Sequence, residues 1–287
     1  MKDLSERYDL HTHTTYSDGT FTVEELLKRA KYIGLKGIAI TDHDTMEGIS
    51  EGKEIARELD LKFIPGIEFS CSYQGYEIHI LGYFLNDKSE KLASKLIELK
   101  KARKERNEKI IKKLNNLGLK ITIEEIEKEA TGTIVSRAHI CNVMMNKGFV
   151  YSKGEAFKQY LGRNGVAYVE KGSSDPIEII KLIKECNGIS ALAHPSLICD
   201  SRERTEKIID ILSEAGLDGL EVEYSSYTSK EIKYYRKLAT EKGLLKVGGS
   251  DFHGGNRVGV DIAHASITEE DIKDLLERES KEEIKWL

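Results

Sequence analysis

Several residue types and patterns are scarce in this chain, and each scarcity excludes a class of protein. Its 287 residues include only four Cys, three Pro and one Trp. The cysteines show no CxxC spacing and are too few for a disulfide-stapled scaffold, so we expect reduced, mostly buried thiols in a cytoplasmic protein. No apolar stretch approaches the roughly 20 residues that span a bilayer, and the first residues lack the apolar core of a secretory signal. The sequence therefore predicts neither a membrane span nor export.

Charge of one sign is not in large excess either. The chain has 44 Lys and Arg against 49 Asp and Glu, a formal net charge of −5. This balance argues against a protein that coats nucleic acid through general positive charge, and no stable binding to duplex DNA is expected. With 39% hydrophobic and 32% charged residues, the chain can build a sizeable core under a solvated surface, which excludes a disordered chain.

Short apolar runs alternate with amphipathic helical patterns at both ends of the chain. Helical spacing over 22–33 ends at Gly34, a plausible C-cap, and Asp175 is a candidate N-cap for a helix over 176–186. A last helix is expected to begin at Thr268. This alternation predicts a mainly parallel α/β sheet, either an open doubly wound form or a closed barrel. Seven strands are predicted, at 7–14, 37–41, 62–70, 76–85, 189–193, 219–224 and 245–250.

The middle of the chain has a different character. It is highly charged and helical from residue 86 to about residue 128, and eight basic residues face two acidic ones within 100–113. We interpret 89–170 as a mainly helical insertion that contributes to substrate binding, and 1–88 together with 171–287 as the catalytic barrel. The basic run is interpreted as a solvated helix face, with an electrostatic funnel for a polyanion as the alternative.

Side chains that can hold metals recur at or within the predicted strands. His11 and His13 are two residues apart, so their rings point to the same side of an extended segment. Glu68 is a carboxylate in an apolar strand, where a charge requires a metal or a positive partner. Because the carboxyl ends of parallel strands meet at one edge, these groups are expected to form a single metal site. The other members are Asp18, Asp42, His43, His79, His194, Asp251 and His253.

The motifs that carry these residues resemble those of a known family. HTHTTYSDG, TDHD, GIEFS, EIHILGY, AHP and GSDFHG are similar, in the same order, to the motifs of the PHP (polymerase and histidinol phosphatase) metallophosphoesterases over residues 7–260. The resemblance implies a distorted (β/α)7 TIM-like barrel with a trinuclear metal centre. It implies one metal held by His11, His13, Glu68 and Asp251, a second held by His79 and His194 with Glu68 as bridge, and a third held by Asp18, His43 and His253.

The metals are expected to be divalent. Mixed imidazole and carboxylate ligands suit Mn²⁺, Fe²⁺ or Zn²⁺ better than Mg²⁺ alone. The family commonly works with Mn²⁺, so the resemblance implies three divalent ions with Mn²⁺ as the first choice.

The predicted insertion carries a second set of candidate residues. Ser136-Arg-Ala-His-Ile140 is similar to the insertion of PHP nucleotide phosphatases, including nucleoside 3′,5′-bisphosphate phosphatases and 5′-to-3′ exonucleases of the RNase AM type. In those relatives a Ser-Arg pair grips substrate phosphate, which the resemblance assigns to Ser136 and Arg137. The planar fork of Arg137 can hold a phosphate bidentately. Arg163 and Lys171 are further phosphate-binding candidates that could equally be plain surface charges.

Together these features predict hydrolysis of a phosphate monoester on a small substrate, a nucleotide such as a nucleoside 3′,5′-bisphosphate or AMP. In this hypothesis a metal-bridging hydroxide attacks phosphorus in line, and Arg137 with the third metal neutralises the phosphoryl oxygens. His43, His253 and Asp251 are expected to be catalytic as well as ligands.

Three alternatives stay open at the level of sequence. One is 5′-to-3′ trimming of short RNA, for which the basic face at 100–113 could matter. Another is a histidinol phosphatase, against which the SRAH insertion speaks. The third is a non-enzymatic PHP binding or scaffold module, which the complete set of ligands disfavours.

Overall fold

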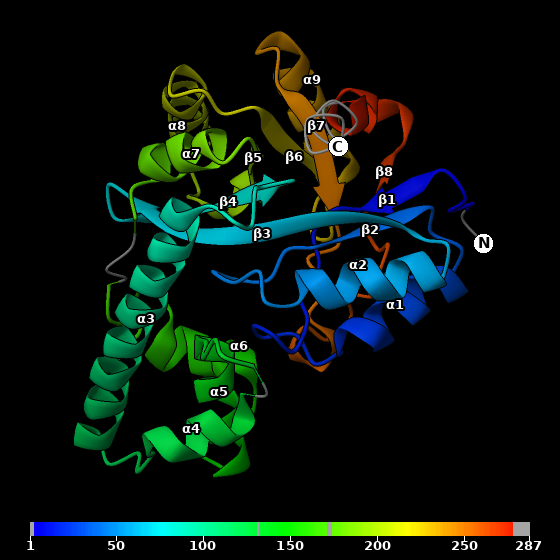
Figure 1. The fold of residues 1–287 in the computed structure, drawn as a ribbon. Coiled ribbons are helices and arrows are strands. Elements are labelled where there is room, and N and C mark those ends of the chain that lie inside the picture. Colours follow the sequence, from blue (N-terminus) through cyan, green and yellow to red (C-terminus); the bar gives the residue numbers. More distant parts are fainter. Residues whose placement is uncertain (1–2, 131, 171–173, 278–287) are drawn as a thin grey trace.

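An eight-stranded sheet forms the centre of the computed structural model, which describes residues 3–130, 132–170 and 174–277 (Figure 1). The strand order is β7-β6-β5-β4-β3-β2-β1-β8. Backbone bonds beyond the strand ends join its two sides, since Leu10 N–H donates to the Gly248 carbonyl at 3.0 Å and Asp251 N–H to the His11 carbonyl at 2.8 Å. The sheet is therefore a nearly closed barrel, and the expected TIM-like α/β architecture is confirmed. The strands are β1 (Arg7–Asp9), β2 (Gly37–Ile40), β3 (Lys62–Tyr73), β4 (Tyr76–Tyr83), β5 (Ile189–Leu192), β6 (Gly219–Tyr224), β7 (Leu245–Gly249) and β8 (Ile267–Thr268).

The sheet is mixed. The β1–β2–β3 and β5–β6–β7 neighbours are parallel, whereas β4 is antiparallel to both β3 and β5. β3 turns into β4 through Gln74 and Gly75, whose φ angles of 50° and 77° lie in the left-handed region of a tight turn. Because β4 runs antiparallel to β3 and β5, its carboxyl end does not lie at the same edge of the sheet as the carboxyl ends of those two strands.

The eighth strand corrects one expectation. A helix was expected to begin at Thr268, but Ile267 and Thr268 form β8, which pairs antiparallel with β1. The Thr268 hydroxyl does accept a hydrogen bond from Asp271 N–H, and helical residues follow from Glu270. Pairing with β1 therefore displaces the start of the helix by about one half-turn.

Helices pack against the outside of the barrel, and local chemistry sets their ends (Figure 1). Thr22 and Glu25 form a capping box before α1, and Asp175 accepts a hydrogen bond from Ile177 N–H at the start of α7, as the sequence predicts. Gly34 follows α1 with φ 83°, which few other residues adopt. The outer helices are α1 (Val23–Tyr32), α2 (Ile49–Glu58), α7 (Pro176–Glu185), α8 (Arg202–Glu214) and α9 (Ser229–Glu241).

A group of helices between β4 and α7 projects from the barrel (Figure 1). They bury a hydrophobic cluster separate from the two clusters of the barrel, and this cluster includes Ile110, Ile126 and Ile140. The division of the chain into 1–88 with 171–287 and 89–170 stays a prediction. The helices are α3 (Glu90–Asn116), α4 (Ile123–Glu129), α5 (Arg137–Asn146) and α6 (Lys153–Ala156), which continues into the π-helical turn Phe157–Leu161.

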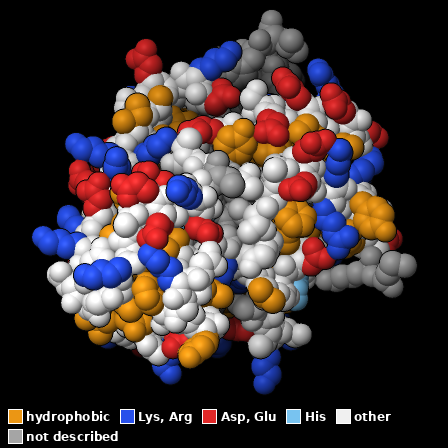
Figure 2. Space-filling view, turned by 90° about the horizontal axis from the view of Figure 1, so that it is seen from below, with side chains coloured by type: hydrophobic (Ala, Val, Ile, Leu, Met, Phe, Trp, Pro, Cys, Tyr) orange, Lys and Arg blue, Asp and Glu red, His pale blue; other side chains and the backbone are white. Residues whose placement is uncertain are grey.

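The surface and the cysteines match their simple expectations. Both signs of charge mix over the face seen in Figure 2, where little histidine surface is visible. All four Cys are free, with Cys71, Cys141 and Cys186 buried and Cys199 half-buried. In the part of the chain that the structure describes, no helix combines the length and apolar character needed to cross a bilayer.

Candidate metal centre and phosphate pocket

The segment after β1 carries the first two ligands. β1 ends at Asp9, two residues before His11, so the predicted strand over 7–14 is too long. The segment stays extended because its neighbours hold it: His13 N–H donates to the Phe252 carbonyl, and Thr41 N–H donates to the Thr12 carbonyl, both at 2.9 Å. This bonding turns the fully buried rings of His11 and His13 into the mouth of the barrel.

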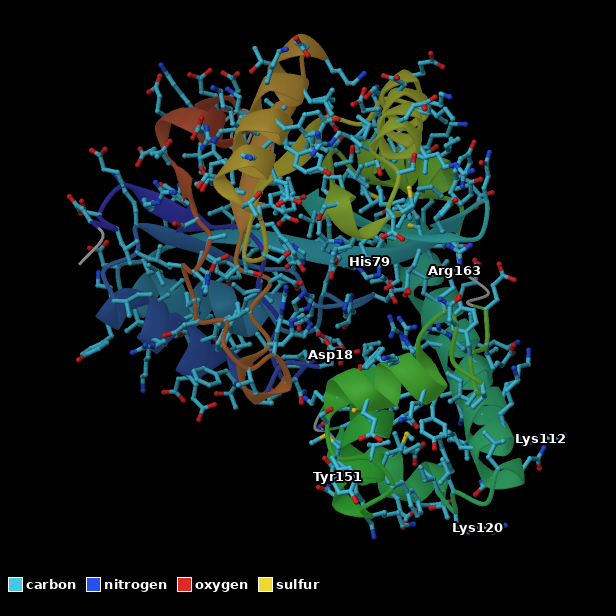
Figure 3. The ribbon with its side chains drawn as sticks, turned by 180° about the vertical axis from the view of Figure 1, so that it is seen from behind. Asp18, His79, Lys112, Lys120, Tyr151 and Arg163 are labelled. Carbon is cyan, nitrogen blue, oxygen red and sulfur yellow. The ribbon has the colours of Figure 1, made fainter. Side chains whose placement is uncertain are left out.

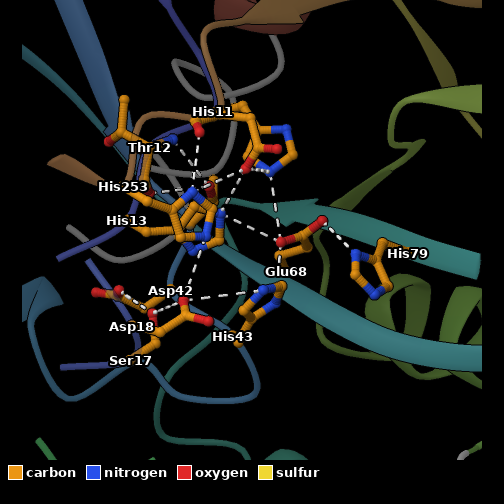
Figure 4. A network of polar contacts seen from close by, with 12 residues as sticks. His11, Thr12, His13, Ser17, Asp18, Asp42, His43, Glu68, His79 and His253 are labelled. Atoms are coloured by element: carbon orange, nitrogen blue, oxygen red, sulfur yellow. Dashed lines mark hydrogen bonds and ion pairs between the residues drawn. The ribbon is translucent and has the colours of Figure 1, made fainter. Parts of the chain in front are cut away.

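Glu68 lies at the centre of the site, fully buried (Figure 4). Its Oε1 lies 2.8 Å from His79 Nδ1 and 3.1 Å from His194 Nε2. Its Oε2 faces three further rings, the closest being His43, whose Nδ1 is 2.9 Å away. In all, five imidazoles lie within 3.4 Å of this one carboxylate: His11, His13, His43, His79 and His194.

Two further carboxylates complete the cluster. Asp251 Oδ1 lies 3.1 Å from His13 Nε2 and 3.4 Å from His11 Nε2. Asp18 Oδ1 lies 3.3 Å from His253 Nε2. Three groups therefore have candidate ligand atoms all within 4.8 Å of one another: His11, His13, Glu68 and Asp251; His13, Asp18, His43 and His253; and His43, Glu68 and His79.

The unpaired atoms of this cluster fit metal ions. Six of its buried atoms make no hydrogen bond in the described structure: His11 Nε2, His13 Nδ1, His13 Nε2, His43 Nδ1, Glu68 Oε2 and His79 Nε2. Buried polar atoms are ordinarily paired, and imidazole nitrogens with carboxylate oxygens are a donor set for borderline divalent ions. Backbone strain gathers here as well, since Asp44, His194 and Asp251 have φ of 53°, 27° and 54°. The residues present thus fit the metals that the sequence motifs imply.

The pKa values of these groups are strongly displaced. Burial opposes a charge on His13, but the carboxylates of Asp251 and Glu68, within 3.2 Å of its Nε2, raise its pKa to about 10. In the same way, the charge of Glu68 outweighs burial and raises the pKa of His79 to about 9. At His43 burial prevails and lowers the pKa. In the metal-free protein, several imidazoles therefore carry protons that offset the buried carboxylates.

Sequence reasoning missed the residues that orient this cluster. Glu221, fully buried in β6, lies 2.9 Å from His11 Nδ1 and accepts a hydrogen bond from His194 N–H at 2.6 Å. Tyr224 and Arg257 both contact Asp251. The signal for Glu221 was a carboxylate inside a predicted buried strand, the same signal that drew attention to Glu68.

Asp9 and Asp42 hold the loops that carry ligands. Asp42 Oδ1 accepts a hydrogen bond from Thr14 N–H at 2.7 Å and another from the Ser17 hydroxyl, next to Asp18. Asp9 accepts one from Ser250 N–H at 2.8 Å, and burial raises its pKa to about 6. Both carboxylates thus hold the loops that carry ligands rather than contacting the cluster itself.

A pocket of about 270 Å³ lies over the cluster. Its barrel side includes Asp18 and His79, which face the projecting helices in Figure 3. Its other walls come mainly from α3, the start of α5, α6 and the turn after α6, and they include Arg103, Arg106, Ser136, Arg137, Lys153 and Phe157. Asn256, from the loop after β7, lines the pocket from the barrel. The basic run of α3 is not all at the pocket, since Lys112 lies at the far end of the projecting helices in Figure 3.

The candidates on the projecting helices have different positions. Ser136 is the N-cap of α5, and Arg137 is the first residue of that helix; both line the pocket. His139 Nδ1 accepts a hydrogen bond from Ser136 N–H at 3.1 Å and so completes the capping box of α5. Arg163 instead lies 4.8 Å from the ring of Tyr76 and does not line this pocket. Lys171 lies outside the described residues.

A buried His and carboxylate cluster beneath an arginine-rich pocket, at the mouth of an α/β barrel, defines a metal-dependent phosphoesterase. A family model described as "PHP domain" matches residues 9–280, so the chain belongs to the PHP family. The predicted family and the predicted enzyme class are both confirmed.

Several relatives that match most of the chain are named for an activity on RNA or on nucleotides. A "5'-3' exoribonuclease" of Haemophilus influenzae is 33% identical over 250 residues, covering 87% of this chain and 91% of the relative. The "5'-3' exoribonuclease Rnm" of Escherichia coli is 32% identical and covers 86% and 85%. A "3',5'-nucleoside bisphosphate phosphatase" of Chromobacterium violaceum is 27% identical and covers 89% and 90%.

Solved structures share the fold over nearly the whole chain. A proposed metal-dependent phosphoesterase from Bifidobacterium adolescentis aligns with a TM-score of 0.86 at 26% identity, covering 94% of this chain and 96% of that one. An amidohydrolase from Chromobacterium violaceum, described with bound sulfate and no metal, aligns with a TM-score of 0.87 at the same identity and coverage.

Proposed function

We propose that this protein hydrolyses phosphate monoesters of nucleotides, with nucleoside 3′,5′-bisphosphates or AMP-like compounds as substrates. The observation that carries the proposal is that Ser136 and Arg137 line the same pocket as residues of the His and carboxylate cluster. The pocket is small enough to select a mononucleotide-sized group, and its guanidinium groups suit phosphate oxygens. The bisphosphate phosphatase among its relatives supports this assignment.

Three divalent ions, Mn²⁺ before Fe²⁺ or Zn²⁺, are proposed as cofactors. The ligands would be His11, His13, Glu68 and Asp251 for the first, His79 and His194 with Glu68 for the second, and Asp18, His43 and His253 for the third. Such ions supply positive charge to phosphoryl oxygens and lower the pKa of a water nucleophile. His79 and His194 both lie beside Glu68 Oε1, which supports a shared role for that oxygen.

The chain itself would bind and orient the substrate. Arg137 is proposed to donate hydrogen bonds from its guanidinium N–H groups to the phosphoryl oxygens, and the Ser136 hydroxyl would be a further donor beside it. Glu221 fixes the tautomer of His11 through Nδ1, leaving Nε2 directed at the cluster. The roles of His43, His253 and Asp251 in the reaction, and those of Arg163 and Lys171 in phosphate binding, are part of the proposal.

A second candidate is 5′-to-3′ trimming of short RNA. The exoribonuclease relatives are somewhat more similar to this chain than the bisphosphate phosphatase. A groove beside the pocket also shares Arg103 with it and is lined by Lys100, Lys101 and Lys104. These lysines could track the backbone of a longer substrate.

Substrate comparison separates the candidates. Product release would be measured with Mn²⁺ on a nucleoside 3′,5′-bisphosphate, AMP, histidinol phosphate, a 5′-phosphorylated dinucleotide and a ten-nucleotide RNA. The proposal predicts the highest kcat/KM for the bisphosphate. A higher value for the RNA assigns the exonuclease role, and selective turnover of histidinol phosphate would overturn both. No turnover, together with no bound metal, would revive the binding or scaffold module.

A further inference from the structure

Arg137, the proposed phosphate ligand, already holds an anion from its own chain. Its Nη2 donates to both carboxylate oxygens of Glu77, at 2.8 Å and 2.9 Å. Its Nη1 donates to the Leu161 carbonyl at 3.3 Å, and its guanidinium lies 5.5 Å from the ring of Phe157. The Nη2 group of Arg137 is therefore already paired with a carboxylate of the same chain.

Glu77 is placed between Arg137 and the metal centre. Its Oε1 is 2.8 Å from Arg137 Nη2 and 3.8 Å from His79 Nε2. Its side chain is 36% exposed and lines the same pocket. It belongs to β4, where it is paired with Ser72 of β3, so its backbone cannot withdraw when a ligand enters. A phosphate that reaches from the cluster to Arg137 must displace this carboxylate or lie beside it.

We propose that Glu77 is a specificity-determining residue that competes with substrate phosphate for Arg137. A carboxylate and a phosphate engage a guanidinium through the same pair of oxygens. Repulsion from the carboxylate grows with the charge of the ligand, so a dianionic phosphate monoester is penalised more than a monoanionic phosphodiester. The inference rests on the proposed role of Arg137, and it makes Glu77 the residue that sets the balance between the two candidate substrate classes.

The two other arginines that the projecting helices bring to the pocket do not share this arrangement. Arg103 pairs with Asp44, which is 2% exposed and lies behind the pocket wall. Arg106 donates from Nε to the Val169 carbonyl, and its Nη2 has no hydrogen-bond partner. Among these three guanidinium groups, only that of Arg137 is paired with a carboxylate that itself lines the pocket. The charge of Glu77 is thus directed at whatever Arg137 binds.

Binding to the metal-free protein tests the inference without turnover. Titration calorimetry at pH 8 would compare inorganic phosphate and sulfate, which are dianions, with dimethyl phosphate, a monoanion. Glu77→Gln is expected to bind the dianions about three- to tenfold more tightly, with a smaller gain for dimethyl phosphate, as expected from removing one nearby charge in a partly solvated site. The gain should vanish in an Arg137→Met background. Glu185→Gln, which removes a carboxylate paired with exposed Lys91 away from the pocket, should change nothing.

Weaker dianion binding in Glu77→Gln would overturn the inference, because it would make Glu77 a clamp that positions Arg137. An equal gain for both charge types would also overturn it. Turnover supplies an independent readout. p-Nitrophenyl phosphate is a dianion and methyl p-nitrophenyl phosphate a monoanion, but both release p-nitrophenolate. Glu77→Gln should raise the kcat/KM for the first relative to the kcat/KM for the second. If the metal-loaded wild type hydrolyses neither, the proposed function fails while the binding data still decide the role of Glu77.

Discussion

Glu68 faces more imidazoles than one carboxylate can neutralise, and this crowding explains the electrostatics of the site. The rings of His13 and His253 have centroids only 4.0 Å apart, and those of His13 and His43 are 4.6 Å apart. Without a metal, such rings must either share protons with the carboxylates or leave buried nitrogens unpaired. The neighbouring carboxylates accordingly raise the pKa of His13, and His11 Nε2 makes no hydrogen bond in the described structure.

At the scale of the residue, metal binding should release protons. His13 and His79 have pKa values of about 10 and 9, so both are largely protonated at pH 8 in the metal-free protein. Each must lose its proton to become a ligand. We expect these two residues to release close to two protons at pH 8, and metal affinity to increase as pH rises from 7 to 9. Calorimetry in two buffers of different ionisation enthalpy counts the protons; a count of zero at pH 8 would contradict the assigned ligands.

Glu221 supplies a second residue-scale prediction. Glu221→Gln removes the charge that orients His11 and His194 but keeps the side-chain volume. Changes to groups that orient metal ligands commonly cost about 10–100-fold in metal affinity. We expect a loss of that size in Mn²⁺ titrations, with the fold intact by circular dichroism. Glu214→Gln, on the exposed side of α8, is the matched control, and equal affinities in the two variants would contradict the assigned role.

At the scale of the element, the start of α5 combines a helix cap with a proposed phosphate contact. Ser136 Oγ accepts a hydrogen bond from Ala138 N–H at 3.0 Å. Ser136→Ala should cost about 1 kcal/mol of unfolding free energy and also raise KM. Ser136→Asp should keep the cap but raise KM further, because its charge repels phosphate. Denaturant unfolding and steady-state kinetics separate the two effects; an unchanged KM in both variants would limit Ser136 to capping.

A buried ion pair joins α3 to the loop after β2. The Arg103 guanidinium pairs with the carboxylate of Asp44, and both side chains are buried. Removing one partner leaves an uncompensated buried charge, so Arg103→Met should destabilise the protein by about 3–5 kcal/mol. Asp44→Asn should do the same, and Asn tolerates the φ of 53° at this position. The double variant should lose less than the sum of the two single losses, and simple additivity in urea unfolding would show that the pair is not coupled.

At the scale of the whole molecule, the sequence was most informative where chemistry is local. The ligand motifs follow or lie within strands, so a barrel sheet brings them together, as seen for His11 with Glu68. The caps of α1 and α7 were likewise local signals. The alternating pattern did not predict the direction of β4, because β4 follows β3 through a hairpin at Gln74 and Gly75 rather than through a crossover helix.

Other contacts between residues distant in sequence could not be predicted. The Arg137–Glu77 and Arg103–Asp44 pairs join residues 60 and 59 positions apart, and they form only because the projecting helices fold back over the barrel mouth. Glu221 meets His11 across 210 residues. Propensity and periodicity carry no information on such packing, which is why the pocket walls emerge only from the structure.

The most direct measurement is metal-dependent phosphate release by the intact protein. The protein would be stripped with a chelator and titrated with Mn²⁺ in the presence of a nucleoside 3′,5′-bisphosphate, beside His43→Ala and Asp251→Asn. The account predicts no release without metal, release that saturates as Mn²⁺ is restored to the wild type, and a loss of at least about a hundredfold in both variants. Release that is independent of metal, or equal in the wild type and the two variants, would contradict it.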